Sequence, residues 1–140
     1  MKTLLSTFAI ILALFTASAQ DQKSTLDNHK NNYVVLTKNV PQLKPILLTA
    51  KALQEQDQEK YGEFQVIICG KTVKELTDKD NMKPFLEAAK NENVKIVVCG
   101  FSMKKFGVKA KDLPRELEVV SNGILYDFEL QKKGYLSIEL

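Results

Sequence analysis

The sequence predicts an α/β fold, a three-layer α/β/α sandwich around a mainly parallel five-stranded sheet. Two observations predict it. Short apolar, β-branched runs alternate along the chain with amphipathic helical patterns, and such alternation is typical of parallel strands joined by right-handed crossovers. One strand-and-helix unit also returns after 30 residues, which is the length of one βα unit.

The first strand and helix are predicted between residues 33 and 53. Tyr33–Thr37 is a short apolar run, as expected for a strand that is buried on both faces. Apolar residues then recur at helical spacing over Pro41–Leu53, after Asn39 as the expected cap. Because Pro45 lacks a backbone N–H, this helix is expected to start late or to kink at that residue.

The same reasoning predicts the remaining elements. Further strands are expected at Phe64–Cys69, Val94–Cys99, Leu117–Val120 and Tyr135–Ile138. Helices are expected at Met82–Asn91 and Gly123–Lys133. The apolar side chains expected to be buried are Phe85, Leu86 and Ala89 in the former helix, and Ile124, Leu125 and Phe128 in the latter.

The N-terminus has the order of a cleavable export signal. Lys2 is followed by an apolar run of 12 residues from Leu4 to Phe15, and then by small residues ending at Ala19. The run is shorter than the roughly 20 residues of a membrane-spanning helix. We therefore expect a signal peptide at residues 1–19, a flexible polar leader at 20–32 and a single domain at 33–140, periplasmic or secreted and without a membrane anchor.

Charge and residue content exclude several classes of function. The chain carries 20 basic and 17 acidic residues, which are interspersed, so no concentrated basic face predicts nucleic-acid binding. The only histidine, His29, lies in the polar leader. A zinc site of three or four Cys and His ligands is therefore not expected, and no nucleotide-binding motif predicts a cofactor.

The repeated unit contains both cysteines of the chain. Val66–Lys74 and Ile96–Lys104 each read as an apolar strand, then Cys-Gly, one further residue, and a Thr or Ser expected to cap a helix. Cys69 and Cys99 are thus expected at the carboxyl ends of two strands, the edge where open α/β sheets bind their ligands.

Thiols in this position have three interpretations. A helix N-terminus and nearby lysines favour the thiolate and hence a reactive cysteine. Cysteine is also among the residue types most often buried, so an inert, space-filling side chain is the second interpretation. A structural Cys69–Cys99 disulfide is the third interpretation, because an exported protein meets oxidising conditions.

From Tyr33 to Ile138 the chain resembles the DsrE/DsrF-like sulfur-relay family, which includes the TusBCD-type carriers. The most informative segment is Val98–Val108, with Cys99, Gly100, Ser102 and then Gly107 eight positions after the cysteine. The resemblance implies that Cys99 receives persulfide sulfur and hands it on. It also implies a homo-oligomer, a trimer or hexamer, and a partner protein that donates or accepts sulfur.

The chain departs from the best-known carriers in three respects. Those carriers have arginine before the glycine, where this chain has Lys105 and Phe106. Cys69 stands where the family often has other residues, so it is either an additional thiol or a resolving partner. The known relays are cytoplasmic, whereas this chain is predicted to be exported.

Three functions follow from these observations. The first is an exported sulfur carrier that uses Cys99, with Cys69 as a second thiol, rather than a conventional enzyme. The second is a non-enzymatic, oligomeric binding module that keeps the fold without the chemistry. The third is thiol–disulfide exchange between Cys69 and Cys99, although these residues lack Cys-x-x-Cys spacing.

Overall fold

The structure is a computed structural model that describes residues 29–140. The expected signal peptide and residues 20–28 of the leader lie outside the described residues. Five strands form one parallel sheet in the order β4-β3-β2-β1-β5. The strands are β1 (Asn31–Thr37), β2 (Tyr61–Ile68), β3 (Val94–Cys99), β4 (Glu118–Val120) and β5 (Leu136–Glu139).

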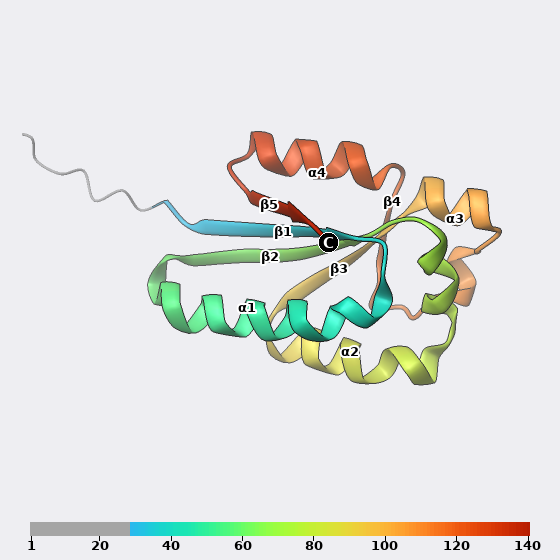
Figure 1. The fold of residues 1–140 in the computed structure, drawn as a ribbon, viewed down its shortest axis with the longest axis horizontal. Helices are drawn as coiled ribbons and strands as arrows, with labels where there is room; N and C mark the ends of the chain where they lie inside the picture. Colours follow the sequence, from blue (N-terminus) through green and yellow to red (C-terminus); the bar gives the residue numbers. More distant parts are fainter. Residues whose placement is uncertain (1–28) are drawn as a thin grey trace, which may run out of the picture.

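Helices cover both faces of this sheet (Figure 1). The α-helices are α1 (Leu43–Asp57), α2 (Lys79–Asn91), α3 (Gly100–Phe106) and α4 (Gly123–Lys132). Short 3-10 segments are η2 (Val40–Gln42), η3 (Gln58–Lys60), η4 (Lys71–Thr77) and η5 (Ala110–Asp112). The α/β/α sandwich with a parallel five-stranded sheet is confirmed.

The order of the strands decides which face each helix covers. From β1 through β4 the chain moves steadily in one direction across the sheet, and from β4 to β5 it returns to the opposite edge. Right-handed crossovers therefore place α1 and α2 on one face and α4 on the other. Figure 1 shows this arrangement, with α4 above the sheet and α1 and α2 below it.

Two apolar cores result, one on each face. The larger core packs α1, α2 and α3 against one side of the sheet, through residues such as Ile46, Met82 and Met103. The smaller core lies beneath α4, contains both cysteines, and consists of Val34, Leu36, Ile67, Cys69, Val97, Cys99 and Leu130. Within residues 29–140, no helix is long and apolar enough to cross a bilayer.

The first strand and helix differ in detail from the prediction. β1 begins at Asn31 instead of Tyr33, because the side chains of Asn31 and Asn32 hydrogen-bond Asp57 and the backbone N–H of Glu63. The delayed helix start is confirmed, since α1 begins at Leu43. Pro45 thus lies in the first turn, where its missing N–H costs no hydrogen bond.

The burial predicted for the last helix is wrong. Ile124, Leu125 and Phe128 are 57%, 51% and 56% exposed, whereas Gly123, Asp127 and Leu130 face the sheet. Buried Asp127 accepts hydrogen bonds from Gln131 and Ser137. The face of α4 toward the sheet carries Gly123, which leaves room for the cysteines, and Asp127, which accepts a hydrogen bond from β5. The larger apolar side chains therefore lie on the outer face of the helix.

Candidate functional site

The carboxyl ends of all five parallel strands meet at one edge of the sheet. Cys69 follows β2, and Cys99 ends β3. Ile67 pairs with Val97 and Ile68 with Val98 across β2 and β3, so the next residue of each strand is a cysteine. The repeated Cys-Gly units therefore place two thiols side by side, both free and both in the core beneath α4.

Cys99 is surrounded by hydrogen-bond donors. The backbone N–H of Gly123, at the start of α4, donates to its Sγ at 3.3 Å. Burial alone raises the pKa of the Cys99 thiol, but hydrogen bonds from the Ser102 hydroxyl, the Gly123 and Ser102 backbone N–H groups and the Cys69 thiol outweigh it. The pKa of Cys99 therefore lies below its ordinary value, which favours the thiolate.

Cys69 has the opposite character. Burial, the neighbouring Cys99 sulfur and the hydrogen bond to it raise the pKa of the Cys69 thiol to about 12. The Lys38 ammonium opposes this rise only in part, and Lys38 is itself paired with Glu139. At neutral pH, Cys69 is therefore a protonated donor facing the more acidic Cys99.

Gly123 closes the site from above. A Cβ atom on this residue would lie 2.7 Å from the Cys69 Sγ, which real Cβ atoms essentially never do, and 3.0 Å from the Cys99 Cβ, which is closer than most real Cβ contacts. The absence of a side chain thus lets the first turn of α4 rest directly on both cysteines. As a result only 4% of Cys69 and 3% of Cys99 is exposed.

The helix caps predicted after each Cys-Gly are wrong. The Ser102 hydroxyl accepts a hydrogen bond from the Gly70 N–H at 2.8 Å, which ties the two repeated units together. The Thr72 hydroxyl accepts from the Val40 N–H and donates to Glu75. Neither side chain caps its helix, because these donors from elsewhere in the fold take up the hydroxyl groups.

The supporting residues identified in the sequence lie in different places. A Cβ on Gly100 would come within 2.8 Å of the Val120 carbonyl oxygen, so this glycine permits close contact with the end of β4. Gly107 ends α3 with φ +73°. Lys105 lies in the last turn of α3, about 9 Å along the helix axis from Cys99, with its ammonium over the Phe106 ring.

The sequence interpretation missed three residues of the site. The sequence pattern identifies Gly123 only as a helix start and indicates no role for Lys38 or Glu139. A signal for each was present, because Lys38 follows the predicted first strand, and Gly123 and Glu139 follow the fourth and fifth. The carboxyl ends of parallel strands share one edge of a sheet, so these residues could have been assigned to the same site.

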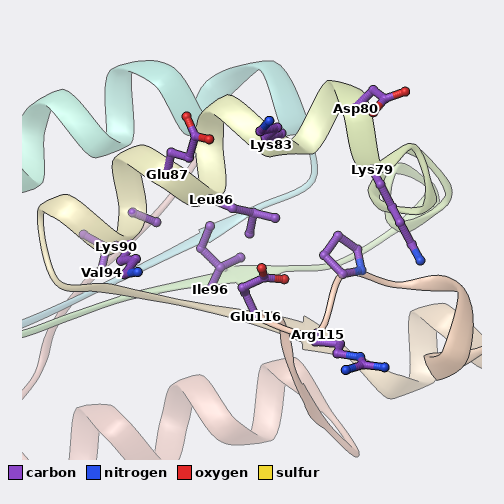
Figure 2. A pocket seen from close by; sticks show the side chains of 12 residues that line it. Lys79, Asp80, Lys83, Leu86, Glu87, Lys90, Val94, Ile96, Arg115 and Glu116 are labelled. Carbon is purple, nitrogen blue, oxygen red and sulfur yellow. The ribbon is translucent and has the colours of Figure 1, made fainter.

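A surface groove lies away from the cysteines. It is a groove of about 740 Å³ between α2 and the chain before β4. Figure 2 shows α2 with Lys83 and Glu87 on one side of it and Arg115 and Glu116 on the other. Its floor includes Ile96, which belongs to the core on the opposite face from Cys99. No group of three or more metal-ligating His, Cys, Asp or Glu side chains occurs within residues 29–140.

The model of the DsrE/DsrF-like family matches residues 46–138, which include both cysteines and four of the five strands. The chain belongs to this family. The resemblance expected from the Cys99 segment is thereby confirmed, whereas no curated protein matches the sequence.

Solved structures show the same DsrE-like fold. MTH1491, a protein of unknown function from Methanobacterium thermoautotrophicum, is 14% identical with a TM-score of 0.65, over 80% of this chain and 99% of its own. BT1422 from Bacteroides thetaiotaomicron is 19% identical with a TM-score of 0.58, covering 79% and 95%. The ychN protein from E. coli is 16% identical with a TM-score of 0.56, covering 78% and 99%. At these identities, the similarity concerns the fold.

Proposed function

We propose that this DsrE/DsrF-like protein is a sulfur carrier, in which Cys99 holds relayed sulfur as a persulfide. The observation that carries the proposal is the placement of Cys99 beneath the first turn of α4. The Gly123 N–H donates to the Cys99 Sγ there, and Ser102 adds two further donors. The same groups stabilise an anion on this sulfur, so they favour the nucleophile that accepts sulfur.

The proposal includes export, with residues 1–19 as the signal peptide. A persulfide is harder to keep where thiols oxidise, and burial of Cys99 beneath α4 supports a carrier that protects its sulfur from solvent. The check is the N-terminus of the protein purified from its producing cell. A chain that starts at Gln20 outside the cytoplasm agrees with export, and a full-length cytoplasmic chain contradicts it.

Sulfur loading is the direct test of the carrier role. The purified protein is incubated with inorganic polysulfide, desalted and examined by intact mass spectrometry and peptide mapping. We expect one added sulfur on Cys99 in the natural protein and in Cys69→Ser, and none in Cys99→Ser. Cys69→Ser is the matched control because it also retains one buried thiol. Equal loading of Cys99→Ser would contradict the proposal.

The outer face of α4 supports a second role, as an oligomeric binding module. Ile124, Leu125 and Phe128 occupy neighbouring positions on one side of the helix and are more than half exposed. Large exposed apolar patches usually bind another protein surface. The proposal is that this face binds a second copy of the chain, in line with the homo-oligomer that the sequence resemblance implies.

Light scattering after size-exclusion chromatography tests this assembly. Leu125→Glu places a charge on this face and is expected to reduce the oligomer to a monomer. Glu129→Gln, also on α4 and exposed, should leave the mass unchanged. A monomeric natural protein, or an unchanged mass in Leu125→Glu, would contradict the assembly. An oligomer that functions equally well in a Cys69→Ser/Cys99→Ser double variant would favour the binding module over the carrier.

A further inference from the structure

The sulfur atoms of Cys69 and Cys99 belong to laterally adjacent positions on neighbouring strands. The pairing of Ile68 with Val98 ends one residue before both cysteines. Lateral Cα atoms of neighbouring strands are about 4.8 Å apart, within the range of about 4.4–6.8 Å found across disulfides. The backbone therefore brings the two thiols within reach of a disulfide, although both are reduced in this structure.

Contacts around the pair make Cys69 the immediate thiol neighbour of Cys99. Cys69 and Cys99 lie in the same buried cluster beneath α4. The position that a Cβ on Gly123 would occupy lies within 3.0 Å of both the Cys69 Sγ and the Cys99 Cβ. Both side chains are almost fully buried, so a sulfur bound to Cys99 is held against Cys69 and is shielded from thiols in solution.

We propose that Cys69 releases the sulfur carried by Cys99 as hydrosulfide, leaving a Cys69–Cys99 disulfide. This activity rests on the proposed loading of Cys99 and adds a chemical exit for the sulfur that needs no acceptor protein. It gives the second cysteine, which is not part of the carrier step, a role of its own.

The step balances without an added reductant. The proton of the Cys69 thiol passes to the outer persulfide sulfur, and the Cys69 sulfur attacks the Cys99 Sγ. The persulfide S–S bond breaks, its electron pair leaves with the outer sulfur as HS⁻, and a bond forms between the two Sγ atoms. The outer sulfur is reduced by two electrons, and the two cysteine sulfurs are oxidised. A further round requires a thiol reductant to reopen the disulfide.

The charges around Cys69 fit this role. The Lys38 ammonium lies close enough to favour a negative charge on the Cys69 sulfur, and the Lys38 side chain lies against Gly70, with its Cγ 3.4 Å from the position of a Cβ there. Glu139 pairs with Lys38 at the exposed edge of the site. Lys38 is therefore placed to stabilise the thiolate that forms as the Cys69 proton leaves.

A single-turnover experiment tests the release. Protein loaded with inorganic polysulfide is desalted into buffer without reductant, sulfide is trapped with monobromobimane, and the protein is followed by non-reducing intact mass spectrometry. We expect the natural protein to release one sulfide for each Cys69–Cys99 disulfide that forms. Cys69→Ser should load equally but release sulfide at least about a hundredfold more slowly, because the adjacent nucleophile is lost. Cys69→Ala serves as the second variant where serine disturbs the buried site.

The outcomes separate this proposal from the carrier role. Loading of Cys99 followed by release at the natural rate in the Cys69 variants would overturn the release step and leave the carrier role intact. Sulfide that leaves the natural protein without formation of the disulfide would do the same. A Cys69→Ser variant that does not load at Cys99, together with a natural protein that neither loads nor forms the disulfide, would overturn both.

Discussion

The two repeated Cys-Gly units begin alike in sequence and end in different structures. After Cys99, the chain enters α3 at once, and the sulfur receives hydrogen bonds from Ser102 and Gly123. After Cys69, Gly70 takes φ +78° and leads into the 3-10 segment η4. Hydrogen bonds from Gly123 and Ser102 thus favour charge at Cys99, while burial and the neighbouring sulfur disfavour it at Cys69. Equivalent positions in a repeat therefore need not share a chemical role.

The largest expected difference between the units is in their thiol titration. Ultraviolet thiolate absorbance should rise in two well-separated steps. Cys99 ionises below its ordinary pKa because donors surround it, and Cys69 ionises only near pH 12 because burial and Cys99 disfavour its charge. As the pH falls, a thiol with a lowered pKa becomes protonated at a lower pH than a free cysteine. Cys99 should therefore keep its charge at pH values where a free cysteine is protonated.

Single-cysteine variants assign the two steps. Cys99→Ser should lose the lower step, and Cys69→Ser should retain it because serine is also a hydrogen-bond donor. Titration of both thiols together near the ordinary cysteine pKa would contradict the contrast between the two units.

Gly123→Ala should disturb both units at once and cause the largest loss of stability. The added Cβ would meet Cys69 and Cys99 at 3.0 Å or less, and overpacking of this kind lowers the free energy of unfolding by about 3 kcal/mol. Chemical denaturation measures the change. Glu129→Ala, on the exposed side of α4, is the control, and an equally small effect of both variants would argue against close packing of α4 on the cysteines.

Ser102→Ala and Thr72→Ala compare the equivalent hydroxyl groups of the two units. Each leaves a backbone N–H without its partner, that of Gly70 or of Val40. Each should therefore lower the free energy of unfolding by about 2 kcal/mol. Only Ser102→Ala should also raise the pKa of Cys99, because Ser102 donates to that sulfur and Thr72 does not. A similar shift in both variants would exclude a specific role for Ser102.

Substitutions at Gly70 and Gly100 should both lower stability and separate two causes. Gly70 has φ +78° with ordinary contact distances around it, so Ala and Ser there should both cost about 1 kcal/mol through backbone strain. At Gly100 the obstacle is the Val120 carbonyl, so serine should cost more than alanine. Denaturation of the four variants checks this, and a strong size dependence at Gly70 would contradict the role assigned to its backbone.

Much of the fold was predictable because it depends on local patterns. The alternation of apolar strands and amphipathic helices places β1, β2, β3 and the helices between them within a few residues. Cys69 and Cys99 could be assigned to strand ends because each closes an apolar run before glycine. A helix start is expected after Cys99 and Gly100, but the bounds of α3 are not predicted, since its seven residues offer too short a pattern to show helical periodicity.

What the sequence could not predict depends on contacts between distant residues. The helix at 123–132 has apolar residues on more than one side, so periodicity alone does not identify its buried face. The buried Asp127 has its partner in Ser137 of β5, and the hydroxyl of Ser102 binds a backbone N–H 32 residues away. Such pairs form only once the sheet order is set.

The sequence by itself determined the parallel α/β class, the family and the identity of the two thiols, because periodicity and the Cys-Gly repeat are local properties of the chain. Only the tertiary structure decided that the thiols are neighbours with unlike proton affinities. That difference arises because the connection from β4 to β5 returns across the sheet and brings the first turn of α4, with its Gly123 N–H, onto the Cys99 sulfur. The cost of burying charge then depends on the donors that the complete fold supplies.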